Sequence, residues 1–193
     1  MNAKDIIREQ ISASAEIKQQ LLSDNRVCDV IAKAAQICVE AYRNGKKTLF
    51  AGNGGSAADA QHLAGEFVSK FYFDRPGLPS IALTTDTSIL TAIGNDYGYD
   101  RLFARQVQAQ GNEGACFHWN IHIRKFPRIS LRHYQNVTVR GFSTIALTGS
   151  KPCKMDDFDL VIKVPSDSPP LYSGMSDFDW PYNLLYCGTG NIR

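Results

Sequence analysis

Apolar residues recur every three or four positions through the first part of the chain, in two sets separated by Asp24-Asn25. This spacing predicts two amphipathic helices, because it places the apolar side chains on one face. The second helix is expected to end at Asn44-Gly45, since glycine readily adopts the left-handed conformation that closes helices. The two sets are Ile6, Ile7, Ile11, Ile17, Leu21 and Leu22, then Val27, Val30, Ile31, Ala34, Ile37, Cys38, Ala41 and Tyr42.

Short apolar runs alternate with helical stretches farther along the chain. Such alternation is typical of a parallel sheet that is covered by helices on both faces. We therefore predict a single α/β domain over residues 1–193, with a doubly wound, flavodoxin-like sheet in three αβα layers, preceded by N-terminal helices over 1–45. Strands are predicted at 47–51, 81–84, 144–148 and 160–164, and helices at 57–70, 88–93 and 101–109, the last two separated by a loop at 94–98.

Two stretches, residues 115–140 and 169–193, depart from this pattern. The first should contain a strand and then a helix, yet its aromatic residues and histidines show no period, and Pro127 interrupts it. Both tryptophans of the chain, Trp119 and Trp180, lie in these stretches. We therefore treat both as atypical segments of the domain.

Composition and charge exclude some classes of function. The hydrophobic share of 44% is ordinary for a globular protein, and no apolar run is long enough for a signal peptide or a membrane span. We therefore expect a cytoplasmic protein with no membrane partner. The net charge of +2 is too small to indicate a nucleic-acid partner, and it arises from basic residues within 115–140.

The cysteines do not suggest a metal site or a disulfide framework. They are odd in number and none stands in a C-x-x-C spacing. We predict buried, reduced thiols. The residues are Cys28, Cys38, Cys116, Cys153 and Cys187.

A glycine-rich loop, Gly52-Asn53-Gly54-Gly55-Ser56, lies between the predicted strand 47–51 and the helix that follows. Glycines allow close approach of a ligand, and the amides and dipole of a helix N-terminus favour phosphate. The spacing is that of neither a Walker loop nor a dinucleotide site, so a sugar phosphate fits better than a nucleotide. The alternative, about equally supported by the spacing, is a tight turn with Ser56 as the helix N-cap.

His62 and Glu66 stand four residues apart on the helix that begins at this loop, so their side chains share one face. That arrangement suits a divalent metal, or acid–base chemistry at the far end of a bound phosphate ester. The alternative is a solvated pair on an exposed helix. For Asn95-Asp96, which follow Gly94, the alternative to a binding role is an ordinary turn.

The stretches 51–62, 82–88 and 92–98, together with Glu66, resemble the phosphoheptose isomerases of the sugar isomerase (SIS) family. The resemblance covers residues 1–114 and 141–168. It implies a zinc-binding homotetramer that converts D-sedoheptulose 7-phosphate into D-glycero-D-manno-heptose 7-phosphate, a precursor of lipopolysaccharide heptose.

The resemblance also implies roles for individual residues. His62 and Glu66 are expected to be zinc ligands, and Glu66 also the catalytic base that moves a proton between C1 and C2 through an enediol. The residues expected to bind substrate are Asn53, Gly54, Gly55, Ser56, Glu66, Asn95 and Asp96.

The two atypical segments lack parts that the family pattern places there. These parts are a Ser-Thr-Ser-Gly phosphate loop after residue 114, and a glutamine and a histidine of a C-terminal helix that complete the zinc site. Reading the codons of 116–128 one nucleotide later permits that loop, and the same displacement over 170–187 permits that glutamine and histidine. Our hypothesis is that 115–140 and 169–193 are frameshifted.

The resemblance leads to one expectation for activity and leaves a second interpretation of the function open. With two zinc ligands of four, the chain as written is predicted to have little or no isomerase activity. The second interpretation is a different class of function. It is a non-catalytic SIS module that senses a sugar phosphate or associates with a replication initiator. The His62 and Glu66 pair favours the enzyme over this interpretation.

Overall fold

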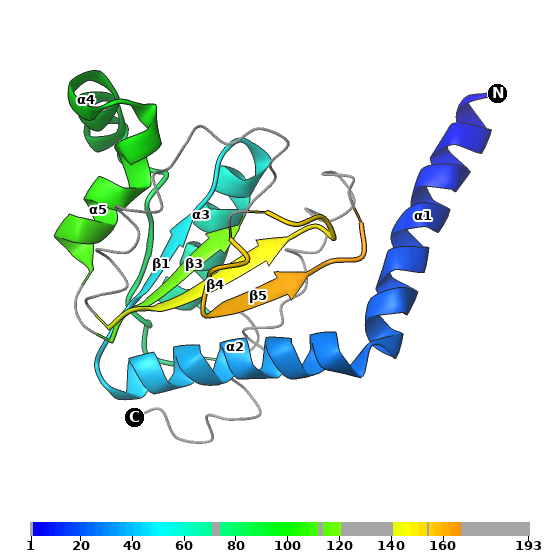
Figure 1. Ribbon diagram of the computed structural model, residues 1–193, viewed down its shortest axis with the longest axis horizontal. Coiled ribbons are helices and arrows are strands. Elements are labelled where there is room, and N and C mark those ends of the chain that lie inside the picture. The colour runs from blue at the N-terminus through cyan, green and yellow to red at the C-terminus, as the bar shows by residue number, and fades with distance from the viewer. Residues whose placement is uncertain (1, 71–73, 112–113, 121–140, 154, 167–193) are drawn as a thin grey trace.

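Helices and parallel strands alternate along the chain in a computed structural model, which describes residues 2–70, 74–111, 114–120, 141–153 and 155–166. Figure 1 shows their arrangement. The elements are α1 (Ala3–Ser23), α2 (Asn25–Arg43), β1 (Thr48–Ala51), α3 (Gly55–Val68), β2 (Ser80–Ala82), α4 (Thr87–Tyr97), the 3-10 helix η1 (Tyr99–Arg101), α5 (Leu102–Gln110), β3 (Cys116–Asn120), β4 (Ser143–Thr148) and β5 (Leu160–Lys163).

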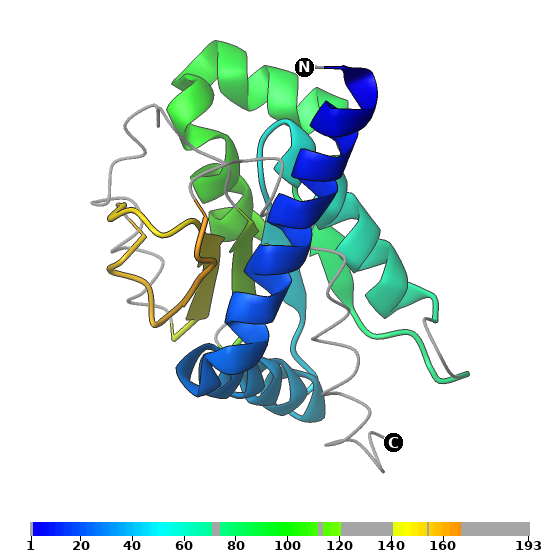
Figure 2. The same cartoon turned by 90° about the vertical axis from the view of Figure 1, so that its right-hand side faces the viewer.

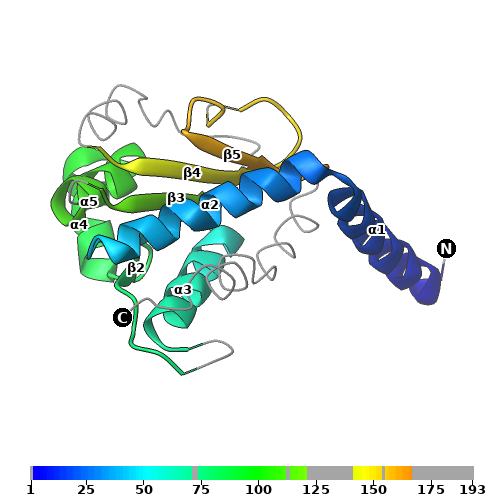
Figure 3. The ribbon, with the colours of Figure 1, turned by 90° about the horizontal axis from the view of Figure 1, so that it is seen from below.

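The strands form one sheet in the order β2-β1-β3-β4-β5, and every neighbouring pair is parallel. Helices α2 and α3 pack on one face of the sheet and α5 on the other. Figure 3 shows α2 from below, lying along the strands. Side chains of a strand alternate between the two faces, so Phe50 joins the first core while Leu49 and Ala51 join the second. The predicted doubly wound sheet in three layers is confirmed.

The core between the sheet and α2 and α3 is centred on Phe67. This side chain is fully buried, and its ring lies 5.6 Å from that of Tyr42 and 5.8 Å from that of Phe50, measured between centroids. The aromatic cluster therefore joins α3 to both α2 and β1. The contacts of this cluster also hold α3 against β1, the strand that leads into the glycine loop.

We expect Phe67→Ala to lower the free energy of unfolding by about 3–5 kcal/mol, because a buried ring is replaced by a cavity. Urea denaturation followed by circular dichroism measures this change. Val68→Ala is the matched control, since its side chain is 54% exposed and it should cost less than about 1 kcal/mol. Equal losses for the two variants would contradict the assignment of Phe67 to the core.

The largest correction to a predicted boundary concerns α4. Residues 94–97, predicted as a loop, form the last turn of α4. The helix begins where the side chain of Asp86 accepts a hydrogen bond from Ile89 N at 2.9 Å, and it ends at Gly98, whose φ is 88°. Glycine and asparagine within 94–97 suggested a turn, but the helix that Asp86 caps continues through them to Tyr97 despite their low helix propensity.

The atypical stretch 115–140 supplies a central strand. Residues 116–120 form β3, which pairs with β1 on one side and β4 on the other, so that Phe117 stands opposite both Leu49 and Thr144. Hydrogen bonding along both edges stabilises a central strand whatever the period of its side chains. The strand expected after residue 114 is therefore present despite its irregular sequence, whereas residues 121–140 and 169–193 lie outside the described part.

Cys38 of α2 and Cys116 of β3 are buried, as predicted. A hydrogen bond with Cys38, and then burial, raise the pKa of the Cys116 thiol well above its usual value, so the thiol stays protonated. The prediction is wrong for Cys28, which is exposed, and Cys153 is half-buried. Cys187 lies outside the described residues.

Helix α1 leaves the body of the domain in Figure 1, and in the turned view of Figure 2 it lies in front of the other elements. Ile17 and Leu21 near its end are buried beside Val164, while Ile7, Ile11 and other apolar residues stay exposed. Among the residues that the structure describes, no helix combines the length and the apolar character needed to cross a membrane.

Candidate functional site

The glycine loop lies where ligands bind in open parallel sheets. It joins the carboxyl end of β1 to α3, and β1 stands between β2 and β3 in the sheet. The chain therefore leaves β1 toward one edge of the sheet and later returns to β3 on the other side. Such a reversal of strand order opens a crevice at the carboxyl ends of the strands, which is the usual ligand position in this architecture.

Two glycines shape this loop. A Cβ atom on Gly52 would lie 2.4 Å from the carbonyl oxygen of Ser56, so no other residue fits there without movement of α3. Gly54 has a φ of 59°, which favours glycine, and it is the N-cap of α3. The alternative of Ser56 as N-cap is wrong. This serine lies in the first turn, fully buried, and its hydroxyl has no hydrogen-bond partner within the described residues.

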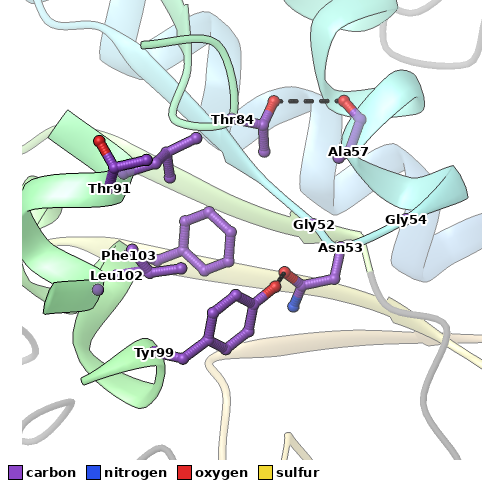
Figure 4. A pocket seen from close by; sticks show the side chains of 11 residues that line it. Gly52, Asn53, Gly54, Ala57, Thr84, Thr91, Tyr99, Leu102 and Phe103 are labelled. Atoms are coloured by element: carbon purple, nitrogen blue, oxygen red, sulfur yellow. Dashed lines mark hydrogen bonds between the residues drawn. The ribbon is translucent and has the colours of Figure 1, made fainter. Parts of the chain in front are cut away.

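A cavity of about 400 Å³ opens beside the loop, between the start of α3 and the helices α4, η1 and α5. Figure 4 shows its walls. The residues that line it are Gly52, Asn53, Gly54, Ala57, Thr84, Leu90, Thr91, Gly94, Tyr99, Leu102 and Phe103.

The cavity contains two of the residues predicted to bind substrate, Asn53 and Gly54. Across it, the hydroxyl of Tyr99 donates a hydrogen bond to Oδ1 of Asn53 at 2.7 Å. Sequence reasoning missed Tyr99 and Thr91. No local signal marks them, because they come from η1 and α4 and meet the loop only in the folded chain.

His62 and Glu66 lie farther along α3 and do not line this cavity. His62 is exposed and Glu66 is half-buried. The guanidinium of Arg75 donates to the backbone carbonyls of Glu66, at 3.0 Å, and Phe67, at 2.8 Å, and so satisfies the end of the helix. Within the described ranges, no group of three or more His, Cys, Asp and Glu side chains is placed to hold a metal ion.

Asn95 and Asp96 lie on the last turn of α4, where a loop was expected. Both are exposed, and Asn95 Nδ2 donates to Asp96 Oδ1 at 2.9 Å. Neither lines the cavity, although Thr91 and Gly94 of the same helix do. The alternative for this pair, an ordinary turn, is wrong, because both residues are helical.

Comparison with known proteins agrees with the fold and the loop. The SIS domain family matches residues 11–115, more than half of the chain, and the match ends where the atypical stretch begins. A parallel sheet with this glycine loop at its switch point thus defines a protein of the SIS class.

Relatives with greater similarity narrow the class. The phosphoheptose isomerase of Aneurinibacillus thermoaerophilus is 52% identical over 169 residues, which are 86% of this chain and 84% of that protein. Phosphoheptose isomerase 2 of Campylobacter jejuni is 51% identical over 170 residues, which are 88% of this chain and 84% of that protein. The chain belongs to the phosphoheptose isomerase family, as its motifs predicted.

Solved structures agree with this assignment. The structure of a phosphoheptose isomerase from Francisella tularensis superposes with a TM-score of 0.83 at 30% identity, covering 97% of this chain and 96% of that one. A phosphoheptose isomerase from Neisseria gonorrhoeae has the same TM-score and identity, covering 96% of this chain and 98% of that one. The fold of the described residues is therefore that of the phosphoheptose isomerase structures.

Proposed function

We propose that the protein is by descent an aldose–ketose isomerase of the cytoplasm that acts on D-sedoheptulose 7-phosphate, with D-glycero-D-manno-heptose 7-phosphate as product, and that the chain as written binds this substrate but turns it over poorly. The observation that carries the proposal is about 50% identity, over most of both chains, to proteins named phosphoheptose isomerases. The glycine loop at the switch point of the sheet supports a phosphorylated ligand. The product would serve as a precursor of lipopolysaccharide heptose.

In this proposal the loop binds the phosphorylated sugar. Gly54 and Gly55 are exposed at the first turn of α3, where amides without partners inside the helix can donate to a ligand. The Asn53 side chain contributes from the cavity wall. Ser56 is buried against Gly52, so it supports the loop from the interior instead of touching the ligand.

Catalysis in this proposal depends on Glu66 as the base that transfers a proton between C1 and C2 of the open-chain sugar. Glu66 stands on the helix that begins at the loop. If the loop holds the phosphate, the seven-carbon chain extends away from it, and its carbonyl end would be the part that Glu66 addresses. Asn95 and Asp96, exposed at the end of α4, would bind sugar hydroxyl groups. Reaching Glu66 from the loop requires the sugar to extend beyond the described cavity.

Zinc is the metal we propose for this site, and the described residues fit it in part. The imidazole of His62 and the carboxylate of Glu66 are donor types that zinc accepts, and they stand one turn apart on α3. No third donor joins them within the part of the chain that the structure describes. When bound, zinc would polarise the substrate oxygens and make the enediol easier to form.

The names of the relatives favour an enzyme over the non-catalytic alternative. Proteins at 52% and 51% identity carry the name of an isomerase, and neither is named as a sensor or as a partner of a replication initiator. We therefore carry only the isomerase forward.

Binding tests the proposal without requiring turnover. We expect the purified chain, with its mass verified, to bind D-sedoheptulose 7-phosphate, and to bind unphosphorylated sedoheptulose at least about tenfold more weakly, because the loop holds the phosphate. NMR titration of the labelled protein measures both affinities. Equal affinity for the two sugars, or binding of neither, would contradict the proposal.

We further propose that the chain forms a homotetramer through α1. Ile7, Ile11 and Leu22 are 56%, 65% and 72% exposed and lie on one side of a helix that leaves the body of the domain. An exposed apolar stripe of this kind usually marks an interface. A second copy of the same helix offers a matching stripe, as symmetric assemblies require.

The tetramer is tested by adding charge to this stripe. We expect the Ile7→Glu, Ile11→Glu double variant to lose the assembly, because burying two carboxylates opposite their copies is unfavourable. Light scattering after size exclusion measures the mass against four times that of the 21.4 kDa chain. The control, Ser12→Glu with Gln19→Glu, adds the same charge on the opposite side of α1 and should leave the mass unchanged. Dissociation of both variants, or of neither, would contradict this interface.

A further inference from the structure

The hydroxyl of Tyr99 reaches from η1 to a side chain of the glycine loop that stands 46 residues earlier in the sequence. It donates to Asn53 Oδ1 at 2.7 Å, the short distance of a good hydrogen bond between oxygens. Tyr99 is 58% exposed, so this contact does not belong to the core. Figure 4 shows the two side chains meeting at one wall of the cavity. The contact therefore concerns the site more than the stability of the fold.

The other hydroxyl groups that line the cavity already donate to the protein. Thr84 Oγ1 donates to a backbone carbonyl of α3 at 3.3 Å, and Thr91 Oγ1 donates to the carbonyl one turn earlier in α4 at 2.7 Å. A hydroxyl has one hydrogen, so these groups have none left for a ligand. Among the lining side chains of the described chain, the amide of Asn53 is the group whose donors remain available.

The hydrogen bond decides which end of the amide a ligand meets. An asparagine amide turned by 180° exchanges its two donors for an acceptor. A phenol is a better donor than acceptor, because its oxygen shares electron density with the ring, so the carbonyl end of the amide is preferred beside Tyr99. Figure 4 shows the oxygen of the Asn53 amide meeting the Tyr99 hydroxyl, a contact that leaves the hydrogens on Nδ2 for a ligand.

We infer that Tyr99 is a positioning residue for substrate binding. It holds Oδ1 of Asn53, so that the two hydrogens on Nδ2 are presented to an oxygen of the sugar phosphate. Without Tyr99 the amide rotates freely and presents its acceptor for part of the time, and an ionised phosphate oxygen, which has no hydrogen to donate, cannot bind that acceptor. This inference rests on the proposed function, since it requires a ligand at the glycine loop.

Four proteins test it by NMR titration with D-sedoheptulose 7-phosphate: the wild type, Tyr99→Phe, Asn53→Ala and the double variant. We expect Tyr99→Phe to weaken binding about 3- to 10-fold, the usual effect of one hydrogen bond, and Asn53→Ala to weaken it by about tenfold or more. The double variant should bind no more weakly than Asn53→Ala alone, because Tyr99 acts only through the asparagine. In the free protein, Tyr99→Phe should also shift the side-chain amide signals of Asn53.

Tyr97→Phe is the matched control. Tyr97 is a neighbouring exposed tyrosine, but its hydroxyl accepts a hydrogen bond from Arg105 at 3.1 Å and forms no hydrogen bond with the described residues of the loop. We expect it to bind as the wild type does and to leave the Asn53 signals unchanged. A loss equal to that of Tyr99→Phe would mean that the tyrosines act through the helices that carry them, which would overturn the inference.

The remaining outcomes separate this inference from the proposed function. If the wild type binds and Asn53→Ala weakens binding while Tyr99→Phe does not, the inference fails and the proposed function stands. If the losses of the two single variants add in the double variant, Tyr99 contacts the ligand itself and the positioning role is wrong. If the wild type does not bind the sugar phosphate, both fail together.

Discussion

Replacing Gly52 by alanine is expected to abolish binding of sugar phosphates by this protein. The added methyl group would lie 2.4 Å from the carbonyl oxygen of Ser56 and 2.6 Å from its Cβ, and neither atom belongs to a flexible side chain end. The loop or the first turn of α3 must therefore move. A displacement of about 1 Å in a binding group can reduce function about 100-fold, and overpacking of this kind costs about 1–3 kcal/mol of stability.

Gly65→Ala is the matched control for this substitution. Gly65 lies in α3, the helix that follows the loop. It does not have a positive φ, and a Cβ there meets no atom within 4 Å. Because alanine favours helix over glycine, this variant should be more stable by up to about 1 kcal/mol and should bind as the wild type does. Thermal denaturation and NMR titration measure the two effects. Normal binding by Gly52→Ala would show that the loop does not hold the ligand.

A second large effect is expected for turnover. The chain as written should isomerise D-sedoheptulose 7-phosphate at less than about one thousandth of the rate of a variant in which 115–140 and 169–193 are replaced by the corresponding segments of the Aneurinibacillus thermoaerophilus relative. The physical reason is that two donors bind zinc poorly. The two segments should supply the remaining zinc ligands and a second phosphate loop, but they do not follow the family pattern. Mass spectrometry of the product sugar phosphate, or a coupled assay, measures the rates.

The restored variant also tests the role of Glu66. There, Glu66→Gln should reduce turnover by about 100- to 10,000-fold, because the amide cannot accept the proton. Glu40→Gln, at an exposed carboxylate of α2, should leave the rate unchanged. Fast turnover by the chain as written, with its mass verified, would contradict the first expectation. The nucleotide sequence across residues 110–193 decides separately whether the two segments are frameshifted.

Local signals were reliable where one short stretch contains all of the interactions that form the structure. The helix over Asn25–Arg43 shows this, because its apolar residues face the core and Gly45, with a φ of 65°, follows its end as predicted. The glycine loop is a second example. Its close approach to Ser56 and its positive φ at Gly54 involve residues within five positions of one another.

Local signals failed where distant parts of the chain decide. The residues of β3 show no period, yet pairing with β1 and β4 makes them the central strand. The end of α4 contains turn-forming residues, yet the helix continues through them to Tyr97. In both cases backbone hydrogen bonds, which the pattern of side chains does not show, outweigh the intrinsic helix or strand propensity of the residues.

By itself, the sequence determined the sheet of parallel strands, the glycine loop between its strand and helix, and the family of the protein, because these follow from periodicity and from motifs of contiguous residues. Only the tertiary structure decided which side chains surround the loop. Tyr99 meets Asn53 because η1 and the end of β1 converge at the carboxyl edge of the sheet, a contact that joins residues 46 positions apart. Such contacts depend on how elements pack, and a single sequence carries no local pattern for them.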